Sequence, residues 1–209
     1  MKYDSNCKDC DRLNSFLIQV KNKNPDYFCK PVPSIGEDKP PFLIVGLAPG
    51  MHGANKTGRP FTGDYAGILL FKTLYKFGFC NAKKSESLSD NLILNNCRIT
   101  NAVKCLPPDN KPNTIEIKNC NKFLKSEIIE LDKGSILLAL GMIAHNAVLM
   151  ALNLTKKEYK FSHGSRHKLP NNLIMFDSYH CSRYNTQTKR LTEKMFHEVF
   201  LSIKTEMEN

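Results

Sequence analysis

The sequence has no apolar segment long enough to cross a membrane. Its longest apolar run covers residues 136–144, well short of the roughly 18 residues that a spanning helix needs. The first residues are polar and contain no apolar stretch of the kind found in secretory signals. We therefore expect a cytoplasmic protein. In that reducing compartment the eight cysteines are not expected to form disulfides, so metal ligation or simple burial must account for them.

Acidic residues are scarce relative to basic ones. The 209 residues include 30 Lys and Arg against 20 Asp and Glu, a formal net charge of +10. Such an excess favours a polyanionic partner such as nucleic acid, although a lysine-rich surface that only aids solubility has the same composition. Repeats, low-complexity tracts and linkers are also lacking, and 41% of the residues are hydrophobic. We therefore expect one globular domain over residues 1–209.

Four short apolar runs are typical of buried parallel strands. They cover residues 42–46, 98–103, 135–141 and 173–177. Helical patterns cover residues 65–77, 113–131, 141–154 and 192–205. This alternation predicts an α/β fold in which helices cover both faces of a parallel sheet. Ligands of such sheets bind beyond the carboxyl ends of the strands.

Two of the predicted helices carry finer signals. Asn113 and Glu116 have the spacing of a capping box, which predicts that a helix begins there. Helical periodicity also predicts which apolar side chains face the core. The inward-facing residues predicted in this way are Ile68, Leu69 and Phe77 in the first helix, and Met195, Val199, Phe200 and Ile203 in the last.

Four of the cysteines are candidate ligands of a metal. Cys7 and Cys10 form a Cys-x-x-Cys pair, whereas Cys105 and Cys120 lie far along the chain. Four thiolates suit either Zn²⁺ or a [4Fe–4S] cluster. Only the first pair is tight, which favours a cluster over a compact zinc ribbon, and unliganded thiols are the third alternative. The remaining cysteines are expected to be ordinary buried or surface thiols: Cys29, Cys80, Cys97 and Cys181.

Two loops at the expected ligand edge have unusual compositions. Residues 46–67 are rich in glycine, which suits backbone that closely approaches a ligand. In this loop Phe61 is placed to stack on a planar ligand or to pack in the core. Asp64 would cap the following helix, orient a water, or do both. In the basic loop of residues 179–192, His180 would donate to a ligand carbonyl or serve a structural role.

Several long motifs occur in order along nearly the whole chain. They are Cys7-Lys-Asp-Cys10, Lys30-Pro-Val-Pro33, Gly46-Leu-Ala-Pro-Gly50, the segment from His52 to Asp64, Ala102-Val-Lys-Cys105, the segment from Pro107 to Pro112, Phe161-Ser-His-Gly164 and the segment from His180 to Thr192. This set resembles the family 5 (type B) uracil-DNA glycosylases, an iron–sulfur-containing branch of the uracil-DNA glycosylase superfamily. The resemblance implies a three-layer α/β/α sandwich around a central four-stranded parallel sheet. It also implies a structural [4Fe–4S] cluster on Cys7, Cys10, Cys105 and Cys120.

The function implied by the resemblance is base excision repair. A monofunctional, monomeric glycosylase would flip uracil, hydroxymethyluracil, ethenocytosine or hypoxanthine out of DNA and hydrolyse the N-glycosidic bond. Asp64 would hold the attacking water, and His180 would donate to the base carbonyl. The resemblance assigns further residues by position: Asn110 and Asn185 assist catalysis, and Leu47, Ala48, Gly50, Phe61 and Asn101 contact the base. In the basic loop, Arg183, Lys189 and Arg190 can hold DNA phosphates, and Arg183, Tyr184 and Gln187 are the alternatives for the residue that inserts into the DNA.

Three positions bear on how this member works. Asn101 stands where some family members have Ala, so its amide would read the uracil edge or would be satisfied by backbone. Lys189 stands where members often have Gly, and would stiffen the loop or contact phosphate. Leu47 is apolar, as in family 5, which argues against a strong general base. The same apolar residue supports an alternative function, an iron–sulfur protein that binds damaged DNA without cutting it.

Overall fold

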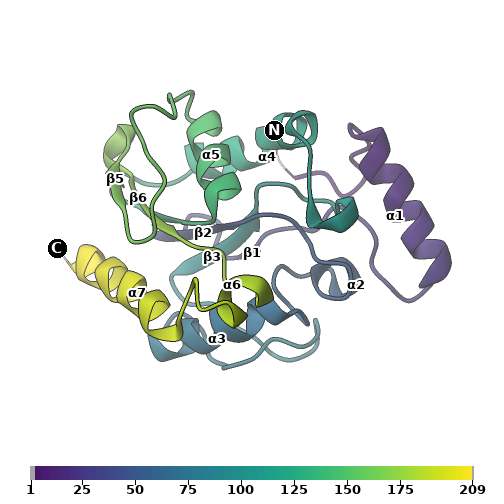
Figure 1. Ribbon diagram of the computed structural model, residues 1–209, viewed down its shortest axis with the longest axis horizontal. Helices are drawn as coiled ribbons and strands as arrows, with labels where there is room; N and C mark the ends of the chain where they lie inside the picture. Colours follow the sequence, from purple (N-terminus) through teal and green to yellow (C-terminus); the bar gives the residue numbers. More distant parts are fainter. Residues whose placement is uncertain (1–2, 209) are drawn as a thin grey trace.

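The apolar runs form the centre of one sheet in the structure, a computed structural model that describes residues 3–208. Its strands are β1 (Ile35–Gly36), β2 (Phe42–Gly46), β3 (Cys97–Asn101), β4 (Ile136–Leu140), β5 (Arg166–Lys168) and β6 (Ile174–Ser178). Its helices are α1 (Asp11–Lys23), α2 (Ala54–Thr57), α3 (Tyr65–Lys76), α4 (Thr114–Ile129), α5 (Met142–Ala151), α6 (Arg183–Gln187) and α7 (Glu193–Glu208). Figure 1 shows their arrangement.

The sheet has the order β1-β3-β2-β4-β6-β5. Strands β3, β2, β4 and β6 pair in parallel, which confirms the predicted four-stranded centre. Two antiparallel edge strands, β1 and β5, widen the sheet to six and were not predicted. Both are short, and β5 consists of Arg166, His167 and Lys168, so neither contains an apolar run.

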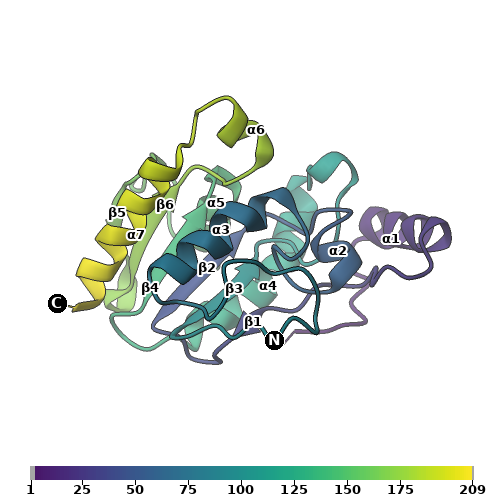
Figure 2. The same cartoon turned by 90° about the horizontal axis from the view of Figure 1, so that it is seen from below.

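Helices cover both faces of the sheet, as predicted. Helices α3 and α7 pack on one face, and α4 and α5 pack on the other (Figures 1 and 2). The alternation along β2 explains this sandwich, because Phe42 and Ile44 belong to the first core and Leu43 and Val45 to the second. Helix α1 lies at one end of the molecule, on the side where β1 forms the edge of the sheet, and packs against α4 (Figure 1).

Helix ends were predicted better than helix faces. The capping box at the start of α4 is confirmed, with Asn113 and Glu116 exchanging hydrogen bonds of 2.8 Å. Ile68, however, is 60% exposed, so the prediction that it faces inward was wrong. Leu69 and Phe77 do pack against the core, and helix α3 also buries Leu70, Phe71 and Leu74. Met195 is only half-buried, whereas its neighbour Phe196 is fully buried.

Tertiary contacts set these helix orientations. In α3, Gly67 lies so close to the carbonyl oxygen of Phe61 that any side chain there would collide with it. This contact holds the first turn of α3 against Phe61, and the next residue, Ile68, faces outward. Helix α1 was missed by the prediction, although its buried Leu13, Leu17 and Val20 have helical spacing. Within residues 3–208, no helix combines the length and apolar character needed to span a membrane.

Candidate functional site

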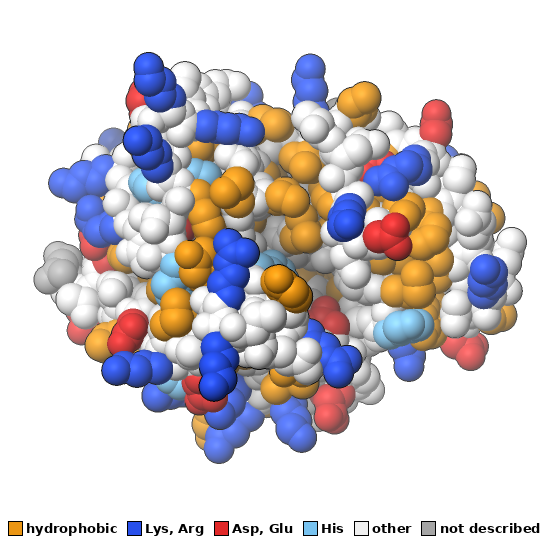
Figure 3. Space-filling model, in the orientation of Figure 1, with side chains coloured by type: hydrophobic (Ala, Val, Ile, Leu, Met, Phe, Trp, Pro, Cys, Tyr) orange, Lys and Arg blue, Asp and Glu red, His pale blue; other side chains and the backbone are white. Residues whose placement is uncertain are grey.

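A cavity of about 360 Å³ opens at the carboxyl edge of the sheet. Its lining residues come from the loop after β2, the end of β3, the turn before α4 and the loop after β6: Leu47, Ala48, Gly50, Phe61, Asp64, Ala66, Asn101, Asn110, His180, Ser182 and Arg183. Figure 3 shows a hollow near the centre of this face, with apolar side chains along its rim. The position agrees with the rule that ligands bind where the strand order changes direction, here between β2 and β4.

Phe61 forms one wall of the cavity and is also part of the core. Its side chain is 5% exposed and packs against α3. Its φ of 56° is left-handed, an uncommon and strained conformation for an aromatic residue. Gly46 and Gly67 permit it, because a Cβ at Gly46 would lie 2.7 Å from the ring and one at Gly67 would meet the Phe61 carbonyl. The ring faces that of His180, with centroids 6.0 Å apart and planes inclined by 24°.

Asp64 caps helix α3 and also lines the cavity. Its Oδ1 accepts a hydrogen bond of 2.9 Å from the Gly67 N–H, so the predicted capping role is confirmed. Oδ2 is directed toward Gly53, where an added Cβ would lie 2.7 Å from it. Burial raises the pKa of the Asp64 carboxyl, and the Gly67 and Ala66 N–H groups partly oppose this shift. Capping therefore leaves one carboxylate oxygen of Asp64 for another partner.

His180 presents a neutral imidazole to the cavity. Burial lowers the pKa of His180 to about 4, because the interior disfavours the charged ring. The loop that carries it is tied down by Asn185, whose Nδ2 donates to the His180 carbonyl at 2.8 Å. Asn185 itself lines a neighbouring cavity of about 270 Å³ rather than the main one. Of the four residues predicted to be catalytic, Asn185 is thus the one outside the main cavity.

Asn101 ends β3 beside the cavity and is 3% exposed. Among residues 3–208, no hydrogen-bond partner contacts its Oδ1. Gly46, paired with Asn101 in the parallel ladder, leaves the space that this oxygen occupies. Buried acceptors are nearly always bonded in native proteins, so this oxygen lacks a partner that such a group normally has. The predicted alternative, in which backbone groups form the hydrogen bonds of the Asn101 side chain, does not hold for its amide oxygen.

The predicted DNA-contacting residues lie exposed on the segment that contains α6. Tyr184 has 70% of its surface exposed. Arg183 lies over the ring of Tyr65, with its guanidinium carbon 5.9 Å from the centroid. Lys189 has a φ of 57°, a left-handed conformation that explains why Gly suits this position. The remaining exposed members of this segment are Gln187 and Arg190.

The four candidate ligand cysteines converge between α1 and α4. Cys7, Cys10, Cys105 and Cys120 pack together and line one small pocket. The pKa of Cys120 is raised to about 11, and the pKa values of Cys10 and Cys105 are also raised. Burial is the largest cause for each thiol, and the neighbouring sulfurs add to it. The Lys104 N–H donates to Cys120 Sγ at 3.2 Å. The other four cysteines are buried free thiols, one of the two environments predicted for them.

Sequence reasoning missed two kinds of site residue. Ala66 and Ser182 line the cavity but were not predicted to do so. Ser182 had a detectable signal, because Ser-x-x-Asn precedes a helix and Ser182 accepts from the Asn185 N–H. Gly46 and Gly67 carry no side chain, and their importance is visible only from the contacts around them.

The protein is an α/β sandwich whose cavity combines an aromatic ring, an amide, a carboxylate and a neutral imidazole. Such a cavity suits a planar polar ligand. The comparisons with known proteins agree with this class. A family model described as "Uracil DNA glycosylase superfamily" matches residues 33–204.

Curated relatives narrow the family further. A type-5 uracil-DNA glycosylase of Thermus thermophilus is 40% identical over 95% of this chain and 92% of its own length. Those of Pyrobaculum aerophilum and Mycobacterium leprae are 38% and 36% identical, over 93% and 95% of this chain and 86% and 90% of their own lengths. The chain therefore belongs to the uracil DNA glycosylase superfamily and, within it, to the type-5 family.

Proposed function

We propose that this chain is a monofunctional uracil-DNA glycosylase that starts base excision repair in the cytoplasm as a monomer. The observation that carries the proposal is the unpartnered Oδ1 of Asn101, buried at a cavity whose other walls include Phe61 and the neutral His180. An amide supplies both a donor and an acceptor, which matches the N3–H and O4 edge of uracil. The relatives named above are uracil-DNA glycosylases, which supports the same substrate.

Base recognition follows from these walls. The target nucleotide must leave the duplex, because its glycosidic bond is inaccessible within the stack. The flipped base stacks on Phe61, and Asn101 bonds its polar edge. As the bond to the sugar breaks, negative charge collects on the base. The N–H of neutral, buried His180 donates to a base carbonyl and stabilises that charge.

Asp64 acts on the sugar side of the bond. Its Oδ1 is held by the helix N-terminus, and Oδ2 accepts a hydrogen from the attacking water. Once ionised, the carboxylate also stabilises the positive charge that develops on the sugar. Asn110 lines the same cavity and helps to hold the water. Leu47 provides no base, so the leaving base must be stabilised well for the bond to break.

The segment around α6 engages DNA. Arg183, Lys189 and Arg190 contact phosphates and fix the position of the duplex. Tyr184 inserts into the space that the flipped base vacates, since its aromatic ring is 70% exposed on this segment. The cavity of about 360 Å³ between Phe61, Asn101 and His180 has room for bases larger than uracil. This volume supports release of hydroxymethyluracil, ethenocytosine and hypoxanthine as well.

The four converging cysteines hold a [4Fe–4S] cluster in this proposal. Within residues 3–208, the sole group of three or more ligand atoms that lie within 4.8 Å of one another is formed by His145, His167 and Asp177. The cysteine sulfurs are therefore spread wider than around one zinc ion, where bonds of about 2.3 Å place sulfurs roughly 3.8 Å apart. The cluster supplies structural cross-linking, because its thiolates connect the segment before α1 to the segment after β3 and to α4.

Release of uracil from DNA tests the function directly. Purified protein is incubated with a uracil-containing duplex and then with alkali, which breaks the strand at an abasic site. We expect strand cleavage by the wild-type chain, and strong loss of cleavage in Asp64→Ala and His180→Ala variants that keep their iron. Tight binding of damaged DNA without base release would instead select the non-cutting DNA-binding protein. Unchanged rates in both variants would contradict the residue roles.

Asn101 offers a test of specificity. We expect Asn101→Ala to lower uracil release about tenfold, because one pair of hydrogen bonds to the base edge is lost. Ethenocytosine lacks that free edge, so its release should change little. Rates on both bases in otherwise identical duplexes provide the measurement. Equal losses on the two bases would indicate that Asn101 only supports the strand end.

A further inference from the structure

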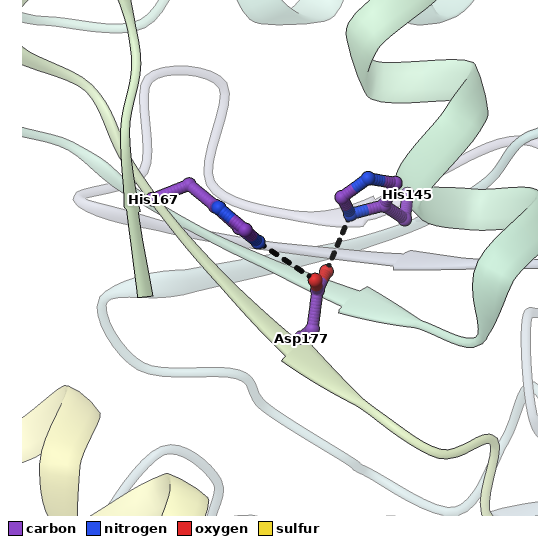
Figure 4. Close-up of side chains that lie close together, drawn as sticks. All are labelled: His145, His167 and Asp177. Atoms are coloured by element: carbon purple, nitrogen blue, oxygen red, sulfur yellow. Dashed lines mark hydrogen bonds and ion pairs between the residues drawn. The ribbon is translucent and has the colours of Figure 1, made fainter. Parts of the chain in front are cut away.

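Outside the cavity, three titratable side chains from three elements meet in the interior. His145 lies on α5, His167 on β5 and Asp177 at the end of β6 (Figure 4). His145 Nδ1 lies 2.8 Å from Asp177 Oδ1, and His167 Nε2 lies 2.9 Å from Asp177 Oδ2. His145 is 1% exposed and Asp177 is fully buried. None of these residues has a part in the proposed reaction.

The hydrogen bonds of His145 require one proton more than a neutral histidine carries. Its Nε2 lies 3.0 Å from the carbonyl oxygen of Tyr159, which only accepts, so Nε2 must carry a hydrogen. Its Nδ1 faces a carboxylate oxygen, which also only accepts. Without an added cation, two lone pairs would face each other in a buried site. Imidazole binds a proton more tightly than a carboxylate does, so the extra proton belongs on His145 and Asp177 remains the anion, whose second oxygen faces His167 Nε2.

A metal ion is the other cation that such a group could hold. At a tetrahedral zinc ion with bonds of about 2.0–2.2 Å, nitrogen and oxygen ligands lie roughly 3.4 Å apart. The separations of 2.8 and 2.9 Å are shorter and are those of direct hydrogen bonds. The distances therefore favour a proton. The rings of Phe161 and His167 also lie beside that of His145, with centroids 5.6 and 5.4 Å away in edge-on contacts.

These residues lie beneath the segment that leads to His180. Asp177 precedes His180 by three positions, and its carbonyl accepts from the Gly164 N–H at 2.8 Å. From the segment that Gly164 ends, His163 accepts from the Tyr179 N–H at 3.1 Å and stacks on the Tyr179 ring. The loop bearing His180 is thus held through its neighbours on the β5 side.

Helix α5 holds the same loop from its other side. Gly141, which caps α5, donates to the Ser178 carbonyl at 2.8 Å, and an added Cβ there would lie 3.4 Å from the His180 Cβ. His145 follows Gly141 by one helical turn, and its N–H bonds the Gly141 carbonyl at 3.1 Å. The link between His145 and Asp177 therefore joins α5 to β6 where both approach His180.

We propose that His145, Asp177 and His167 form an ion-paired brace, with His145 as a buried imidazolium, that positions His180 against the flipped base. The three are positioning residues, and their effect on the rate rests on the proposed function. The pair needs no added ion, because the charges of His145 and Asp177 cancel within the group.

The charge state has a spectroscopic test that does not depend on activity. Long-range proton–nitrogen spectra of ¹⁵N-labelled, cluster-loaded protein at pH 7.5 report each imidazole, and a His145→Gln variant assigns the His145 signals. We expect both His145 ring nitrogens to be protonated and His167 to be neutral. In Asp177→Asn the amide can donate to Nδ1 and accept from His167, so His145 should become neutral without loss of fold. A neutral His145 in the wild type, or a metal other than iron that is lost in His167→Gln, would overturn the proposal.

The positioning role is tested by single-turnover uracil release. His145→Phe fills the site but removes both hydrogen bonds, and we expect the rate to fall about tenfold at unchanged DNA affinity. Asp177→Asn keeps the bonds and should retain most of the rate. If His145→Phe does not fold, His145→Gln replaces it, and a full rate in the folded variant would refute the role. If the wild type itself releases no uracil, the proposed function fails and the spectra alone decide the charge state.

Discussion

At the scale of single residues, the two titratable groups of the cavity are shifted toward their neutral forms. Burial raises the pKa of Asp64 and lowers the pKa of His180 to about 4. Neutral His180 serves the proposed chemistry, because it can donate to the base without an ionisation cost. Asp64 must be ionised to hold water, so at neutral pH its carboxylate costs folding free energy. Activity and stability therefore oppose each other at Asp64.

An Asp64→Asn variant should show this opposition. Asn caps helices about as well as Asp, so the bond to Gly67 is retained while the buried charge is removed. We expect uracil release to fall about 10²–10³-fold, while the thermal midpoint at pH 7 rises. Strand-cleavage rates and thermal melts provide the measurements. Asp64→Ala is the matched control, because it loses the cap as well and should melt lower; an Asn variant with the wild-type rate would refute the catalytic role.

His180 should make stability depend on pH below neutrality. Because the folded pKa is about 4 and the ordinary value is 6.5, the unfolded chain binds an extra proton between these values. The contribution of neutral, buried His180 to the free energy of unfolding is therefore complete above pH 6.5 and is lost as the pH falls toward 4. Urea unfolding of wild type and His180→Gln at pH 7 and pH 4.5 measures it. We expect the wild type to lose more stability than the variant, and equal losses would contradict the burial of His180.

At the scale of elements, the segment with α6 is built to meet DNA. Helix α6 spans five residues, is capped by Ser182, and carries the 70% exposed Tyr184. A short, capped helix holds this ring outward at a fixed place. Such rigidity lets an inserted side chain offset part of the cost of unstacking a base, which is a few kcal/mol.

A Tyr184→Ala variant should therefore lose activity where unstacking costs most. We expect uracil release from a U·A duplex to fall about tenfold, and release from single-stranded DNA to change little. Tyr75→Ala on α3 is a suitable control, because Tyr75 is also exposed, at 44%, but lies away from the cavity. Equal losses on single and double strands would assign Tyr184 to backbone contact instead of insertion.

Helices and strands also differ in how far the sequence predicts them. The central strands and the α4 capping box follow from local patterns and were correct. The edge strands β1 and β5 were missed, because they owe their conformation to pairing with β3 and β6 rather than to apolar residues. On α3, Leu69 and Phe77 pack against the core as predicted, whereas Ile68 is exposed, because apolar spacing alone does not tell which part of a broad apolar face is covered.

At the scale of the whole molecule, the cysteine site joins distant parts of the chain. The Cys7–Cys10 segment and α1 meet α4 there, and the ion pair of Arg12 with Glu116, at 2.7 Å, adds to the same junction. Glu116 is buried and accepts from Arg12 through both carboxylate oxygens, so this pair helps to hold the junction. A bound cluster would add a second tie between the N-terminal segment and the sheet.

Removing a ligand tests this tie. We expect Cys120→Ala to lose iron and its brown colour and to unfold at lower urea concentration, because the buried thiols then have no cluster to bind. Cys80→Ala is the control, since Cys80 is also buried but belongs to the core on the α3 and α7 face of the sheet, and it should keep its iron. Iron and sulfide analysis with urea titration measures both effects. Full iron content in Cys120→Ala would exclude Cys120 as a ligand.

The sequence by itself determined the central strands, the capped helix α4, the position of the cavity at the carboxyl edge and most of the residues that line it. These features depend on periodicity, caps and motifs, which act over a few neighbouring residues. Only the tertiary structure decided the left-handed conformation of Phe61, the unpartnered oxygen of Asn101, the shifted pKa values of Asp64 and His180, and the meeting of His145 with Asp177. The reason is physical: burial, desolvation and hydrogen-bond supply depend on atoms brought together from remote parts of the chain.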